Sequence, residues 1–227
     1  MPLIRLIAGL GNPTRTHERD RHNAGFWLLE RHAAAAGIRF AKDAKYQALT
    51  ARASTSTGEI WWVMPQTYMN LSGRSVGGVA RFYKIAPEEI LVVHDELDFA
   101  PGTAKLKQGG GVGGHNGLKD IAAQLGSQNF WRLRLGIGHP GDRALVSDWV
   151  LSSPPPADRA AIDESIARSI AVLPLIVAGD LAGAMQQLHG QPVQAKPAVV
   201  KPAVATPNSS KPSAPTPGAP SVSPKKD

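Results

Sequence analysis

The pattern of apolar and polar positions over the first 190 residues alternates between two kinds of segment. Nearly continuous apolar runs such as LIRLIAGL and ILVVH are typical of strands buried on both faces of a sheet. Between them, apolar residues recur every three or four positions, as in GFWLLERHAAAA, which stops at Gly37 as helices often do. We expect strands over residues 3–10, 46–54, 59–65, 90–94, 103–108 and 131–138, and helices over 25–37, 71–84, 116–126 and, as a pair around Pro174, 157–189.

This alternation predicts one α/β domain over residues 1–190, with a sheet covered by helices. A chain of 227 residues can bury a sizeable core, and the absence of cysteine excludes disulfides and thiolate metal sites. The first apolar run is interrupted by Arg5 and is too short for a signal peptide, and no later stretch reaches the length of a membrane span. We therefore expect a cytoplasmic protein without membrane association.

Residues 191–227 differ from the rest of the chain in composition. They hold nine of the 19 prolines, set among alanine, serine, valine and lysine with no apolar period, which predicts a disordered or polyproline-like C-terminal tail. The tail also carries five lysines and one acid, more than half of the net charge of +7. The charge of the domain is therefore mild and does not by itself establish nucleic-acid binding.

Two loop clusters near the N-terminus carry polar residues that suit either a structural or a chemical role. GLGNP and RHNAGF contain Asn12, His22 and Asn23, which a tight turn and a helix cap would also explain. PQTYMNLSG places Asn70 just before a predicted helix. It is either a cap or the lip of a cleft, where its amide offers both a donor and an acceptor.

Two further clusters follow in the middle of the chain. In HDELD, Asp95 ends a buried strand and needs a partner such as a histidine, unless the acids of this loop form a divalent metal site. In GGGVGGHNGLKD, a glycine-rich run opens a helix and could cradle phosphate or move as a flap. It lacks the GK[ST] ending of a nucleotide-binding loop, and His115 and Asn116 are either helix caps or ligand contacts.

Together the clusters contain histidines, a candidate orienting carboxylate and several asparagines, without cysteine or a GxSxG serine. This set favours water activated by a histidine beside a polarised carbonyl, and hydrolysis of an ester fits it best. Two rival hypotheses stay open. One is a metal-dependent phosphoesterase built on HDELD, and the other is a noncatalytic RNA-binding module that uses the glycine-rich run and the basic tail.

Six strings at compatible spacing give the chain a close resemblance to bacterial peptidyl-tRNA hydrolase. They are GLGNP, RHNAGF, YMNLSG, HDELD, GGVGGHNGLKD and RLRLGIGHPGD, and the likeness extends from about Leu3 to His189. The resemblance implies a monomeric enzyme with a twisted, mixed and largely parallel sheet surrounded by helices. It also implies cleavage, without metal or cofactor, of the ester between a peptide and the terminal ribose of tRNA, which recycles tRNA from peptidyl-tRNA that has left the ribosome.

The resemblance also assigns roles to residues. His22 would be the general base and Asp95 its orienting partner, while Lys107 and Arg134 would grip phosphate on the acceptor end of the tRNA. The expected substrate-binding residues are Asn12, His17, Tyr68, Met69, Asn70 and Asn116. The chain departs from the family pattern at two of its positions, with Thr14 where a glycine is usual and His17 where a tyrosine is usual.

Overall fold

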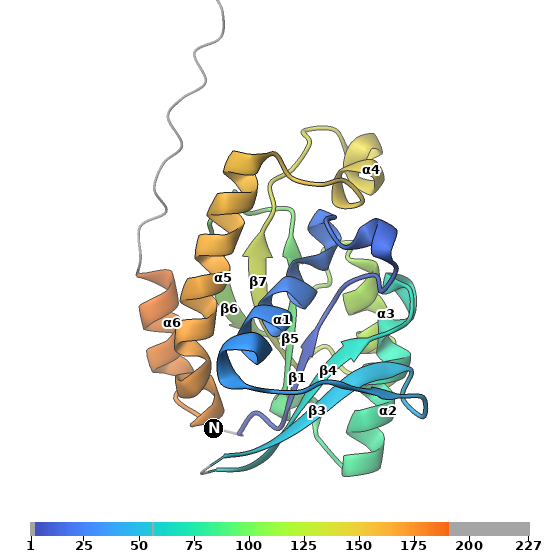
Figure 1. Cartoon of the computed structure of the whole chain (residues 1–227), viewed down its shortest axis with the longest axis vertical. Helices are drawn as coiled ribbons and strands as arrows, with labels where there is room; N and C mark the ends of the chain where they lie inside the picture. The colour runs from blue at the N-terminus through green and yellow to red at the C-terminus, as the bar shows by residue number, and fades with distance from the viewer. Residues whose placement is uncertain (1–2, 56, 191–227) are drawn as a thin grey trace, which may run out of the picture. The chain divides into compact units, whose positions relative to one another are not determined.

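The sheet at the centre of the domain confirms the α/β fold class predicted from the sequence. The structure is a computed structural model that describes residues 3–55 and 57–190. Its strands are β1 (Leu6–Gly9), β2 (Ala41–Asp43), β3 (Ala48–Thr55), β4 (Gly58–Pro65), β5 (Ile90–Glu96), β6 (Ala104–Gln108) and β7 (Trp131–Gly136), shown in Figure 1. Within these residues seven strands pair in the order β2-β3-β4-β1-β5-β7-β6. The predicted tail, 191–227, lies outside the described residues and stays a prediction.

Strand direction makes the sheet mixed and largely parallel. The four central strands β4, β1, β5 and β7 run parallel to one another, whereas β2 and β3 extend one edge and β6 the other in antiparallel pairs. The chain leaves β1 to build β4 on one side and then crosses to build β5 on the other. In open α/β sheets, binding sites lie at the carboxyl ends of strands around such a reversal.

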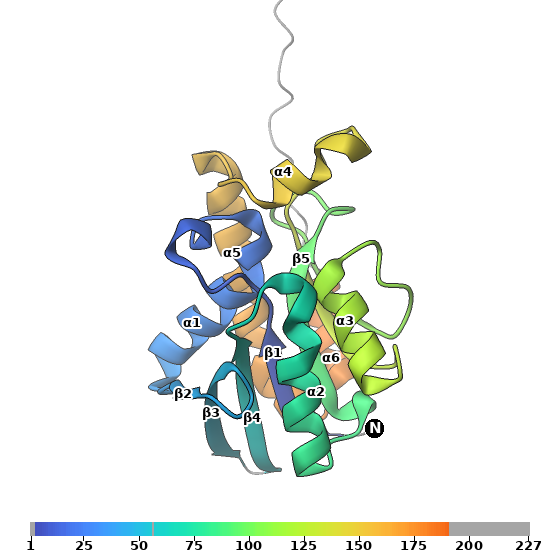
Figure 2. The ribbon, with the colours of Figure 1, turned by 90° about the vertical axis from the view of Figure 1, so that its right-hand side faces the viewer.

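Helices cover both faces of the sheet. Their bounds are α1 (Ala24–Ala36), α2 (Ser72–Tyr83), α3 (Asn116–Leu125), α4 (Val146–Val150), α5 (Pro156–Val177) and α6 (Leu181–His189). Figure 2 shows α2 and α3 on one face and α1 and α5 on the other, with α4 beyond the end of the sheet. Two hydrophobic clusters match these layers, and alternate strand residues such as Leu91 and Val92 enter opposite clusters.

One predicted boundary was wrong, and two short elements were missed. The terminal helices were expected to divide at Pro174, but α5 continues to Val177 and the chain turns at Gly179, where φ is +85°. Pro174 has no backbone N–H and removes one hydrogen bond from the helix. The buried side chains of Leu173 and Ile176 nevertheless hold the helix on the core. β2 and α4 are too short to show a period in the sequence. Within the described residues, every helix is too short or too polar to cross a membrane.

Candidate active site

Loops after β1, β4 and β5 meet the start of α3 around a cavity of about 1020 Å³. β1 and β5 are hydrogen-bonded neighbours, so the residues that follow them meet at one edge of the sheet. The cavity is lined by nine of the ten predicted site residues: Asn12, His22, Tyr68, Met69, Asn70, Asp95, Lys107, Asn116 and Arg134. Short α4 closes another side with Val146, Ser147 and Val150.

His22 reaches the end of β5 because α1 packs unusually closely on the sheet. It lies in a short 3₁₀ helix, Arg21–Asn23, directly before α1. A Cβ added to Gly25 would lie 2.4 Å from the backbone nitrogen of Leu10 and 2.4 Å from the carbonyl oxygen of Val93. Only glycine allows this approach, so the backbone beside His22 touches both β5 and the loop after β1.

Two histidines share one oxygen of Asp95. Nδ1 of His22 lies 2.9 Å from Oδ1 of Asp95, and Nε2 of His115 lies 3.0 Å from the same atom. Nδ1 of His115 accepts the backbone N–H groups of Gly117 and Leu118, which leaves the ring proton on Nε2 to be donated to Asp95. An ionised Asp95 accepts from both rings, so His22 carries its proton on Nδ1 and presents an unprotonated Nε2.

The electrostatics of the buried group agree with this assignment. Burial by itself raises the pKa of Asp95, but the neighbouring imidazoles of His22 and His115 hold the pKa well below its ordinary value. Burial also lowers the pKa of His22, yet the charge and hydrogen bond of Asp95 outweigh burial and the net pKa is raised. Asp95 therefore makes the imidazole a stronger base than its buried surroundings alone would permit.

A third histidine, His94, lies beside His115 and stays neutral. Its ring centroid is 5.0 Å from that of His115, and its Nδ1 donates to the backbone carbonyl of Asp95 over 2.6 Å. Burial, aided by the proximity of His115, lowers the pKa of His94 to about 3. His94 therefore adds no positive charge next to Asp95.

Asn12 is held rigidly at the cavity wall. Its backbone N–H donates to Oδ1 of Asn23 over 2.8 Å, and Nδ2 of Asn23 donates back to its carbonyl oxygen over 3.0 Å. The side-chain oxygen of Asn12 accepts the N–H of Met69 over 2.9 Å. This bond fixes the orientation of the amide, so its nitrogen is placed to donate to a ligand.

The remaining predicted substrate contacts divide into buried and exposed groups. Met69 is buried, while Tyr68 is 61% exposed at the rim. Asn70 and Asn116 are exposed and line the cavity from the short helix before α2 and from the first turn of α3. Both amides are therefore accessible at the wall of the cavity.

Lys107 and Arg134 lie at the end of the cavity formed by β6 and β7. Lys107 pairs in register with Arg132, and Arg134 pairs with Lys105, so all four side chains leave the same face of the sheet. Nε of Arg134 donates to Oε2 of Glu96 over 2.8 Å, and its guanidinium lies 4.2 Å from the ring centre of Phe99. Arg134 is thus held in place, and its positive charge is partly offset by Glu96.

His17 is the predicted site residue that the structure does not bring into this group. It lies outside the residues that line the cavity, and its Nδ1 is 2.6 Å from Oδ2 of Asp20. Asp20 in turn is one of the charges that raise the pKa of His22. A contact between His17 and substrate stays a prediction.

Two residues of the site had no assigned role in the sequence-based prediction. His115 was left open between a helix cap and a ligand contact, and it is a cap that also donates to Asp95. Asn23 was read as a possible cap, but its side chain fastens Asn12 instead. Both roles depend on contacts with residues far apart in the sequence, which a single sequence does not reveal.

The acids of HDELD do not form the metal site considered in the sequence analysis. Asp95 is buried with the histidines, Glu96 bonds Arg134, and Asp98 is exposed. In the described part of the chain, the group whose atoms converge closely enough for a metal ion is His22, Asp95 and His115. The short distances from His22 and His115 to Asp95 also match charge-assisted hydrogen bonds.

Comparison with known proteins agrees with this fold and gives the family of the chain. The family model described as peptidyl-tRNA hydrolase matches residues 6–196. The peptidyl-tRNA hydrolase of Nitrosomonas eutropha is 57% identical over 82% of this chain and 95% of its own, and that of Delftia acidovorans is 53% identical over 82% and 90%. A crystal structure of peptidyl-tRNA hydrolase from Acinetobacter baumannii is 45% identical with a TM-score of 0.79, covering 82% of this chain and 94% of that one. The chain therefore belongs to the peptidyl-tRNA hydrolase family.

Proposed function

We propose that this hydrolase cleaves the ester between a peptide and the terminal ribose of tRNA, with water activated by His22 and without a metal ion. The observation that carries the proposal is the shared oxygen of Asp95, which orients His22 and His115 by hydrogen bonds of 2.9 and 3.0 Å. The release of free tRNA from peptidyl-tRNA that has left the ribosome would be the biological result.

In the proposed reaction, Nε2 of His22 takes a proton from water as the water oxygen attacks the ester carbonyl. The tetrahedral intermediate collapses, and the ribose oxygen leaves with the proton that His22 had taken up. Asp95 supports the imidazolium that forms between these steps and keeps the ring in one tautomer. A positioned base of this kind contributes about a hundred- to ten-thousandfold to the rate.

Asparagine amides would bind the reacting end of the substrate. The free amide nitrogen of Asn12 is fixed by Asn23 and Met69, so it can donate to the ester or to the developing oxyanion with little reorganisation. Asn70 and Asn116, which also line the cavity, would contact the ribose or peptide. Tyr68, at the rim, would cover the substrate.

Lys107 and Arg134 would bind phosphate at the acceptor end of the tRNA. Their shared face of β6 and β7 leads directly into the cavity that holds His22. We further propose that the enzyme acts as a monomer in the cytoplasm, where translation produces its substrate. Few phosphate contacts also predict a shallow dependence of binding on salt concentration.

One experiment tests the reaction and its metal independence together. Purified full-length protein is incubated with peptidyl-tRNA, with and without a strong chelator, and the release of free tRNA is followed. We expect equal release under both conditions. Binding without release would favour the RNA-binding module, whereas loss of release with chelator, restored by added metal, would assign His22, Asp95 and His115 to a metal ion.

A further inference from the structure

The glycine-rich loop, residues 109–114, runs from Lys107 on β6 toward His115 at the start of α3. Four of its glycines have positive φ, from +56° to +92°. A Cβ added at Gly111, Gly113 or Gly114 would meet nothing within 4 Å, so this backbone projects into open space. The loop therefore depends on a few anchors for its position.

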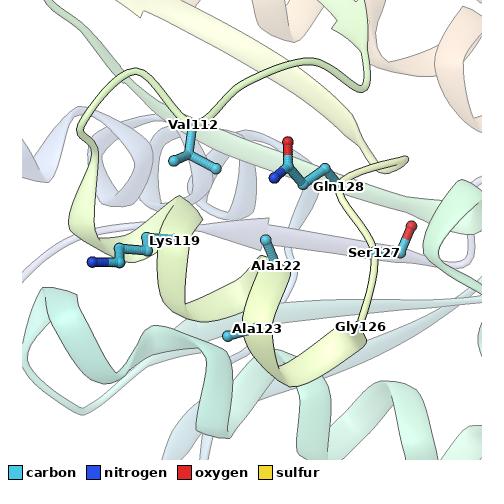
Figure 3. A pocket seen from close by; sticks show the side chains of 7 residues that line it. All are labelled: Val112, Lys119, Ala122, Ala123, Gly126, Ser127 and Gln128. Carbon is cyan, nitrogen blue, oxygen red and sulfur yellow. The ribbon is translucent and has the colours of Figure 1, made fainter.

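Beneath the loop is a second hollow of about 370 Å³, shown in Figure 3. Val112, Lys119, Ala122, Ala123, Gly126, Ser127 and Gln128 line it. Val112 packs partly buried against the core and separates this hollow from the larger cavity. On the side of α3, the loop meets the core through Val112, which also borders the empty volume of the hollow.

Arg132 supplies the anchor on the other side. This β7 residue is 3% exposed, and its two terminal nitrogens donate to the carbonyl oxygens of Gly111 and Gly110 over 2.5 and 2.6 Å. Its guanidinium lies 4.7 Å from the ring centre of Phe130. Among the described residues, no other side chain donates a hydrogen bond to the carbonyls of this loop.

The loop contacts Lys107, the residue proposed to bind phosphate. A Cβ added to Gly110 would lie 2.9 Å from Nζ of Lys107, so the ammonium rests against the loop backbone. Movement of Gly110 therefore changes the space available to that ammonium. His115, in contrast, is fixed independently by Asp95 and by the backbone of α3.

We infer that Arg132 is a positioning residue that clamps the glycine-rich loop and thereby sets the placement of Lys107 for phosphate binding. The inference rests on the proposed function, because it assumes that Lys107 meets phosphate of the tRNA. The chemistry at His22 does not pass through this clamp. Loss of the clamp should therefore weaken substrate binding more than it slows the reaction.

The test compares Arg132→Met with Arg132→Lys and with Arg168→Met. Arg168 offers a matched control, since it also donates to a glycine carbonyl, that of Gly102, but lies outside the cavity. We expect Arg132→Met to raise KM for peptidyl-tRNA about tenfold, in line with the loss of hydrogen bonds from a charged donor, with kcat within about threefold. Arg132→Lys should recover part of the loss, and Arg168→Met should match the wild type.

A short peptidyl-oligonucleotide without the acceptor stem separates the inference from the proposed function. With this substrate, Arg132→Met and wild type should have similar KM values, because the phosphate contact is absent. If wild-type protein releases tRNA but Arg132→Met keeps its KM on peptidyl-tRNA, the inference alone is wrong. If the wild type cleaves neither substrate, the proposed function is wrong.

A measurement on the wild type covers the case in which the variants do not fold. The clamp predicts hindered rotation of the Arg132 guanidinium, so its terminal N–H groups should give separate nuclear magnetic resonance signals at low temperature. Freely rotating, averaged signals for Arg132 would overturn the inference without any substitution.

Discussion

Replacing Asp95 with asparagine tests the central electrostatic claim without changing the shape of the side chain. Both His22 and His115 donate to Oδ1, so the amide must keep its oxygen toward them and turn its nitrogen away. The two hydrogen bonds persist, but the negative charge is gone. The ring of His22 keeps its tautomer and loses the partner of its imidazolium.

The expected loss follows from two estimates. Hydrogen bonds to a charged group contribute about 1.5–3 kcal/mol and neutral ones about 0.5–1.5, so the exchange costs at least about 1 kcal/mol. The upper bound is the attraction of two unit charges about 4 Å apart at an effective dielectric constant of about 20, which is about 4 kcal/mol. Since about 1.4 kcal/mol corresponds to tenfold in rate, kcat should fall by about fivefold to several hundredfold.

The assay measures kcat and KM for tRNA release between pH 5 and 9 at constant ionic strength. The wild-type rate should be lost as pH falls through the raised pKa of His22, above the ordinary 6.5. In Asp95→Asn, burial of the His22 ring is no longer outweighed by a negative charge and lowers the pKa of His22. The acid limb of the kcat–pH profile should therefore move to lower pH, while KM changes little. Asp163→Asn on α5 removes the same charge outside the cavity and serves as control. An unchanged kcat, or an acid limb of the pH–rate profile that does not move, would show that the charge of Asp95 does not support the imidazolium of His22.

Three other outcomes are expected. His22→Ala should lower kcat by about a hundredfold or more while the circular dichroism spectrum stays that of the wild type, and near-normal turnover would show that another group is the base. Gly25→Ala should lower both stability and kcat, because its methyl group would meet backbone at 2.4 Å, and a melting temperature equal to the wild type would contradict that contact. The pKa of His94, lowered to about 3, means that the unfolded chain gains a proton near 6.5 that the folded chain resists, so stability is lost as pH falls from 6.5 toward 3. The free energy of unfolding, measured with urea between pH 4 and 6, should depend on pH less steeply in His94→Asn than in the wild type, by about 1.4 kcal/mol per pH unit. An equal pH dependence in both proteins would exclude His94 as its source.

Local pattern was enough to predict most of the fold. Apolar runs and helical spacing placed the long strands and helices, because each element is stabilised by burial of a face that its own residues define. The resemblance carried by six motifs named His22 and Asp95 as a pair. The residues alone showed only that a carboxylate at the end of a buried strand requires a partner. Elements of three to five residues, such as β2 and α4, hold too few positions to show a period.

The hydrogen bonds among polar side chains of the site depend on how the elements pack in three dimensions. His22 and His115 are 93 positions apart in the sequence, yet both rings bond one oxygen of Asp95, because β1 and β5 are neighbours and Gly25 lets α1 pack closely on the sheet. The pairing of β6 with β7 likewise brings Arg132 to the carbonyl groups of Gly110 and Gly111, whereas the contact of His17 with Asp20 is local in the sequence. Residue type and periodicity determine what each segment buries, whereas strand order and close backbone contact determine which polar groups are left to satisfy one another.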